Sequence, residues 1–81
     1  MGTSRLKPAK LGEKLLAIRR RSDSSLSQIA AMLSDESVKI RKQDVSRFER
    51  GEREPNLIIL LRYARLARIS VESLIDDDLN L

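Results

Sequence analysis

Residues 42–55 read KQDVSRFERGEREP, and this stretch decides the fold. Its two large apolar residues before the glycine, Val45 and Phe48, are three positions apart, which puts them on one face of a helix. Gly51 follows as a favoured residue at a helix C-terminus, and a proline ends the linker after it. We therefore expect a helix over about residues 41–50 that buries one face and exposes long polar side chains on the other.

A second short helix precedes this one. Residues 26–33, LSQIAAML, carry apolar side chains on one face, which predicts a helix over about residues 27–33. Ser25 and Ser27 both suit its N-cap, because a serine hydroxyl can accept from the unpaired amides of a first turn. Residues 34–37 are polar and form the connection between the two helices.

Three further helices complete the expected domain. A helical pattern begins at Lys10, with Leu11, Leu15 and Ile18 on one face, and runs to a break at residues 22–25, which are rich in serine. Asn56 can cap a helix over residues 57–67, and Ser70 can cap a last short one. No alternating strand pattern occurs, so the sequence predicts an all-α, compact five-helix bundle.

The domain boundaries follow from the same patterns. We expect a helix-turn-helix domain over residues 10–76, a flexible basic arm over residues 1–9, and a short acidic and apolar tail over residues 77–81. The longest apolar run, residues 57–61, is too short to span a bilayer. No signal-peptide pattern is present, so we expect a cytoplasmic protein, associated with the nucleoid, and no membrane partner.

The amino-acid composition excludes most classes of catalytic site. The 81 residues make one domain with one core, and they include no Cys and no His. The chain therefore has no thiolate nucleophile, no zinc-thiolate site and no imidazole base. We expect no enzyme activity, no catalytic residues, no metal and no cofactor.

The charge distribution favours an anionic partner. Lys and Arg number 16 against 12 Asp and Glu, a net charge of +4. The basic excess lies in residues 39–53, whereas residues 76–78 are three aspartates that we interpret as a solubilising tail. A basic middle beside an acidic end predicts one face for an anionic polymer.

The ordered set of motifs resembles the Cro-like, or XRE-type, helix-turn-helix family, also called lambda-repressor-like. Residues 26–28 (LSQ), residues 45–55 (VSRFERGEREP) and residues 68–75 (RISVESLI) carry the resemblance, which covers residues 10–75. It implies a sequence-specific transcriptional regulator, a repressor, that binds double-stranded DNA as a homodimer. The helix over residues 42–50 would enter the major groove.

The chain departs from the family pattern at three places. Residues 34–39 lengthen the connection between the second and third helices, and Arg41 stands where the family places a Ser or Thr cap. The LSQ match also lies closer to the following Ile-Ala than the family pattern has it. An unshifted register puts Ser25 and Leu26 at the family's Ser and Gln positions.

The polar side chains opposite Val45 and Phe48 suit DNA recognition. Lys and Arg donate to guanine, Gln pairs with adenine, and a carboxylate accepts from cytosine. With the resemblance, this implies base-reading roles for Lys42, Gln43, Asp44 and Arg47, where Asp44 could instead offset the helix dipole. The implied phosphate-binding residues are Ser27, Gln28, Arg41, Ser46, Arg50 and Arg53.

Other residues are assigned structural or interface roles. The resemblance implies a partly buried ion pair between Arg19 and Glu49 that orients the third helix. Arg62, Arg65 and Arg68 are interpreted as a solvated helix face, and Tyr63 as packing against the core edge in preference to stacking on a base. The expected dimer interface residues are Ile58, Ile59, Val71, Leu79 and Leu81.

One alternative function remains open from the sequence. The same fold can serve as an antitoxin-like or adaptor module that holds a protein partner. A steep dependence of DNA affinity on salt separates the two hypotheses, because only phosphate contacts release counterions.

Overall fold

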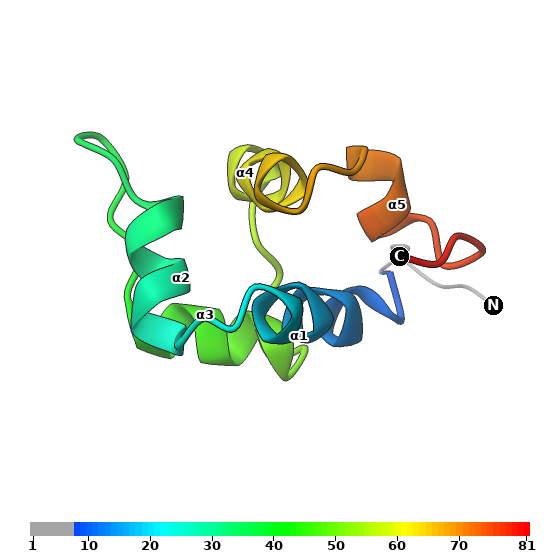
Figure 1. The fold of residues 1–81 in the computed structure, drawn as a ribbon, viewed down its shortest axis with the longest axis horizontal. Helices are drawn as coiled ribbons and strands as arrows, with labels where there is room; N and C mark the ends of the chain where they lie inside the picture. Colours follow the sequence, from blue (N-terminus) through cyan, green and yellow to red (C-terminus); the bar gives the residue numbers. More distant parts are fainter. Residues whose placement is uncertain (1–7) are drawn as a thin grey trace, which may run out of the picture.

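The computed structural model describes residues 8–81, and this part of the chain is all-α, as predicted (Figure 1). Its five helices are α1 (Leu11–Arg21), α2 (Leu26–Leu33), α3 (Lys42–Glu49), α4 (Leu57–Ala67) and α5 (Val71–Ile75). The five-helix class is therefore confirmed. Most of the predicted arm over residues 1–9 lies outside the described residues.

One apolar core joins all five helices. Helices α2 and α3 pack against each other and α3 packs against α1, while α4 and α5 close the other side (Figure 1). Tyr63 of α4 is fully buried among these side chains, so its ring packs in the core and is not available to stack on a base. The buried apolar side chains are Leu11, Leu15, Ile18, Ile29, Ala30, Leu33, Val45, Phe48, Ile59, Leu60, Tyr63, Ala64 and Leu74.

Short polar side chains set where the helices begin. Ser25 is the N-cap of α2: its hydroxyl accepts from the Gln28 amide at 3.0 Å, and Gln28 Oε1 accepts from the Ser25 amide at 2.7 Å. This reciprocal pair decides for Ser25 over Ser27 as the cap. Asn56 and Ser70 cap α4 and α5, as their residue types predict.

The lengthened connection between α2 and α3 is an ordered loop. Asp35 Oδ1 accepts from the backbone amides of Ser37 and Val38, both at 2.8 Å. Its other oxygen is bound by Arg62 of α4, which also donates to the Leu33 carbonyl at 2.6 Å. The expectation that Arg62 belongs to a solvated face is therefore wrong. The loop projects on the side of α4, away from α3 (Figure 1).

The two ends of the described chain hold each other. The carboxylate of Asp77 accepts from the backbone amides of residues 9–10 at 2.9 and 3.0 Å. In return, the buried amine of Lys14 donates to the carbonyls of Ser73 and Asp76 at 2.7 and 2.8 Å. We call these contacts the terminal clasp. Asp77 thus holds the two residues that precede α1, and the solvated-tail interpretation does not fit it.

The apolar run at the start of α4 is divided between core and surface. Leu57 and Ile58 are 71% and 51% exposed, whereas Ile59 and Leu60 are 1% and 7% exposed. The expectation that Ile59 belongs to a dimer interface is wrong, because it turns toward the core one turn before Tyr63. None of the helices in residues 8–81 has the length and apolarity to cross a membrane.

Candidate nucleic-acid interface

The candidate surface is built on α3, which divides its side chains between two faces. Val45 and Phe48 are 0% and 3% exposed and anchor the helix to the core. Lys42, Gln43 and Arg47 lie on the opposite, exposed face. This is the inward and outward division that the spacing predicts.

The start of α3 is held by an acid in place of a hydroxyl cap. Arg41 is the N-cap residue, and its backbone amide donates to Asp44 Oδ2 at 2.9 Å. Arg53, from the linker after α3, donates to the other oxygen of Asp44 at 3.0 Å. The hydrogen bond from the Arg41 amide is the main cause that lowers the pKa of Asp44, against its own burial and together with the charges of Arg41 and Arg53.

These contacts settle which of two roles the geometry favours for Asp44. Its side chain is 6% exposed and both oxygens are engaged within the protein. The base-reading assignment is therefore a misassignment, and the carboxylate serves the positive end of the helix. Arg53 likewise turns back to Asp44, with its guanidinium 5.9 Å from the centre of the Phe48 ring.

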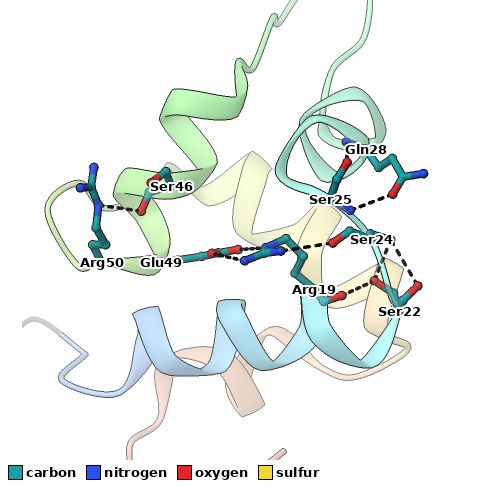
Figure 2. Close-up of polar contacts among 8 residues, drawn as sticks. All are labelled: Arg19, Ser22, Ser24, Ser25, Gln28, Ser46, Glu49 and Arg50. Atoms are coloured by element: carbon teal, nitrogen blue, oxygen red, sulfur yellow. Dashed lines mark hydrogen bonds and ion pairs between the residues drawn. The ribbon is translucent and has the colours of Figure 1, made fainter.

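The other end of α3 is fixed to α1 by the expected ion pair, which is confirmed. Arg19 Nε lies 2.7 Å from Glu49 Oε2, and Arg19 Nη2 lies 3.1 Å from Oε1, a two-point contact drawn in Figure 2. Arg19 also donates to the Ser24 carbonyl at 3.2 Å, which links the pair to the turn before α2. The hydrogen bond to Glu49 raises the pKa of Arg19, so the guanidinium stays charged.

The outward side chains converge on one groove. This groove has a volume of about 350 Å³, and its lining combines α3 with the first residue of α2: Leu26, Lys42, Gln43, Ser46, Arg47 and Arg50. Arg50 lies across its end, where Nε donates to the Ser46 carbonyl at 3.4 Å (Figure 2). Five residues predicted to contact DNA therefore share one surface.

The predicted phosphate anchors of α2 are not among the residues that line this groove. Ser27 and Gln28 are both exposed in the first turn of the helix. Gln28 Oε1 is occupied by the Ser25 amide, as Figure 2 shows, so its amide nitrogen is the atom that can donate to a ligand. Arg41 is also exposed, one residue before α3.

A second hollow, of about 520 Å³, lies between α1 and the end of α3 and has the opposite character. Glu13, Glu49 and Glu54 are among its lining residues, with Arg50 at its edge. Within residues 8–81 no acidic cluster has the geometry to hold a metal ion.

Sequence reasoning missed the contact between Asp44 and Arg53, although a signal for it was present. A residue with no acceptor at the N-cap position, followed by an acid three residues later, is half of a capping box. Asp44 has that position relative to Arg41. Nothing local indicated that Arg53 would return to it.

The fold is shared with solved repressor structures. The P22 c2 repressor protein, in a crystal structure in complex with synthetic operator 9T in the presence of Tl+, has a TM-score of 0.72 and 25% sequence identity, with 84% of this chain and 96% of that chain covered. The solution structure of the DNA-binding domain of the P22 c2 repressor (1–76) has a TM-score of 0.72 and 24% identity, over 93% of this chain and 92% of that one. No protein-family model and no curated protein matches the sequence. This chain has the helix-turn-helix fold of the P22 c2 repressor DNA-binding domain.

Proposed function

We propose that this protein is a sequence-specific DNA-binding transcriptional regulator, a repressor, of the Cro-like or XRE type. The observation that carries the proposal is the α3 groove, where Lys42, Gln43 and Arg47 stand on the outer face of a helix anchored at both ends. The similarity to repressor domains supports the same conclusion. We place its activity in the cytoplasm, on the nucleoid.

In this proposal α3 enters the major groove and the surrounding residues hold the backbone. Lys42 and Arg47 donate to guanine, and Gln43 pairs with adenine. The phosphate contacts come from both helices and from the residues that flank α3: Ser27, Gln28, Arg41, Ser46 and Arg50. The loop projects toward α4 at Asp35, whereas its end, at Lys39 and Ile40, shares a surface hollow with Ser27 and Lys42.

Salt titration of binding to a random duplex tests DNA binding itself. Each phosphate contact adds about 0.9 to the slope of log affinity against log salt, so several contacts make it steep. Arg50→Ala should lower the slope by about 0.9, the contribution of one phosphate contact. Arg65→Ala, on the exposed face of α4, is the matched control and should leave the slope unchanged. A flat response of the wild-type protein, or no binding at low salt, contradicts the proposal and favours the protein-interaction alternative.

In vitro selection from a random pool tests sequence specificity. Arg47→Ala should relax the preference at one position of the selected site, with a loss of about 1–3 kcal/mol. Repression follows if the selected site, placed over a promoter, lowers reporter output in the presence of the protein. Selection of no common sequence would limit the function to nonspecific binding.

We further propose that the protein binds as a homodimer, because two-fold symmetric sites need two recognition helices. Two of the apolar residues expected at the interface are exposed, Ile58 at 51% and Leu79 at 40%, while Val71 and Leu81 are half-buried. Ile58→Asp should lower the dimer population in sedimentation equilibrium and leave the helical content unchanged. A wild-type protein that stays monomeric at high concentration and on its selected site contradicts this part.

A further inference from the structure

The first turn of α3 depends on a single carboxylate. A helix begins with amides that have no partner in the helix, and a Ser, Thr, Asp or Asn side chain ordinarily caps them. Arg41 offers no acceptor at that position. Asp44 supplies one instead, by accepting from the Arg41 amide at 2.9 Å.

That carboxylate needs a counter-charge, because the Asp44 side chain is only 6% exposed. Two cations provide it: Arg53 at 3.0 Å, from a linker that folds back along the helix, and the Arg41 side chain, whose Nε lies 3.6 Å from Oδ2. The backbone amides of Glu52 and Arg53 donate to the Arg47 carbonyl at 2.9 and 3.3 Å, which fixes the root of the Arg53 side chain. The guanidinium then passes over Phe48 to reach Asp44.

The contact bears on the base-reading residues through their position. Lys42 and Gln43 lie between Arg41 and Asp44, so they are carried on the turn that the carboxylate closes. Arg47 lies one turn further on, near the end of α3 that the ion pair of Glu49 with Arg19 fixes to α1. The contact of Asp44 with Arg53 therefore affects the orientation of Lys42 and Gln43 relative to Arg47.

We infer that Asp44 and Arg53 are positioning residues: their ion pair sets the direction of the first turn of α3, and Arg53 acts on DNA recognition through Asp44 instead of through a phosphate. The inference rests on the proposed DNA binding, which it refines. It differs from the assignment of Arg53 as a phosphate contact in what the loss of the side chain changes. Loss of a phosphate contact lowers the affinity for all DNA sequences alike. Loss of the correct orientation of the base-reading residues lowers the affinity for the preferred sequence most.

The experiment compares Arg53→Ala, Asp44→Asn and the double variant with Arg50→Ala, the matched exposed arginine. Three quantities are measured: the affinity ratio between the selected site and a random duplex, the salt slope on the random duplex, and the melting temperature. We expect each single variant to lower the affinity ratio about 3- to 10-fold with an unchanged slope. The double variant should lose no more than either single one, and Arg53→Lys should restore part of the ratio.

Three outcomes overturn the inference. The salt slope of Arg53→Ala could fall by about 0.9 while its affinity ratio stays unchanged, which is the result expected of Arg50→Ala. Arg53 would then be a phosphate contact. The melting temperature could fall while the ratio stays constant, which makes the pair structural only. The losses of the two single variants could instead add in the double variant. If the wild-type protein binds no duplex, the proposed function fails, and this result is distinct because it appears before any variant is compared.

Discussion

Tyr63 lies in the core, and its hydroxyl is the only buried side-chain polar atom without a hydrogen-bond partner within residues 8–81. Burial, followed by the nearby charge of Glu49, raises the pKa of Tyr63, so the phenol stays neutral wherever the protein is folded. A buried hydroxyl that bonds to nothing carries its desolvation cost without return. The ring, in contrast, fills the space between the helices.

Tyr63→Phe should therefore be tolerated. We expect the free energy of unfolding in urea to stay constant or to rise by up to about 1 kcal/mol, because the variant keeps the ring and removes the unpaired group. Tyr63→Leu is the control and should lose about 1–3 kcal/mol through poorer packing. A Phe variant less stable than the wild type by more than about 1 kcal/mol would mean that the hydroxyl has a partner.

Asp35 gives the α2–α3 loop a pH dependence. Hydrogen bonds from Ser37, then from the Val38 amide and Arg62, lower the pKa of Asp35 to about 2. Because this folded-state value is below the unfolded one of about 3.9, the contribution to stability is full above pH 4 and is lost as the pH falls toward 2. A carboxyl NMR titration should give the low midpoint, and Ser37→Ala should raise it. A midpoint near 4 in the wild-type protein contradicts the loop geometry.

At the scale of elements, two glycines allow the observed position of α3 for different reasons. A Cβ added at Gly12 of α1 would stand 2.6 Å from the Glu49 carbonyl oxygen, so this glycine lets α1 approach α3 closely. Gly51 follows the end of α3 with a φ of +73°, where a Cβ meets no atom within 4 Å. The first is required by packing and the second by backbone conformation.

Gly12→Ala and Gly51→Ala should differ in size of effect. We expect the first to lose more than about 2 kcal/mol of unfolding free energy, because backbone must move to admit the methyl group. The second should lose about 1 kcal/mol, and Gly51→Asn less, since asparagine tolerates a positive φ. Thermal unfolding measures both. Equal losses would show that α1 and α3 are not in close contact.

The elements themselves could be predicted from the sequence, because apolar periodicity and capping residues are local signals. The boundaries of α4 and the two faces of α3 follow directly from them. Apart from Ile59, the errors concern charged residues whose partners lie in other segments of the chain. Arg62 bonds Asp35 in the loop, and Arg53 returns to Asp44, whose residue type alone suits a base reader equally well. A charge pattern shows which residues can pair, and only the fold shows which ones meet.

Lys14 makes the same point for the whole molecule. The sequence places it beside the apolar stripe of α1, where a lysine is expected to point to solvent, yet it is 7% exposed. The fold brings the carbonyls at the end of α5 within its reach, at 2.7 and 2.8 Å. The terminal clasp thereby joins the first helix to the last.

Lys14→Met should weaken the whole fold. The variant keeps the apolar stem and leaves the carbonyls of Ser73 and Asp76 without their buried donor, so we expect a loss of about 1–3 kcal/mol in urea unfolding. Lys10→Met, at an exposed position, is the control and should change stability little. Faster amide exchange confined to α1 and α5 would accompany the loss. Equal stability of the two variants contradicts the clasp.

The terminal clasp also brings the segments near the two ends of the described chain into contact. Because Asp77 holds residues 9–10, the segment after α5 returns to the start of α1. A short peptide joining those points, with a cut in the projecting loop at residues 35–38, would give a permuted chain that runs α3, α4, α5, α1, α2. In that chain the recognition helix would come first, and its partner helix last. Contact alone, without a covalent turn, would then hold the pair together.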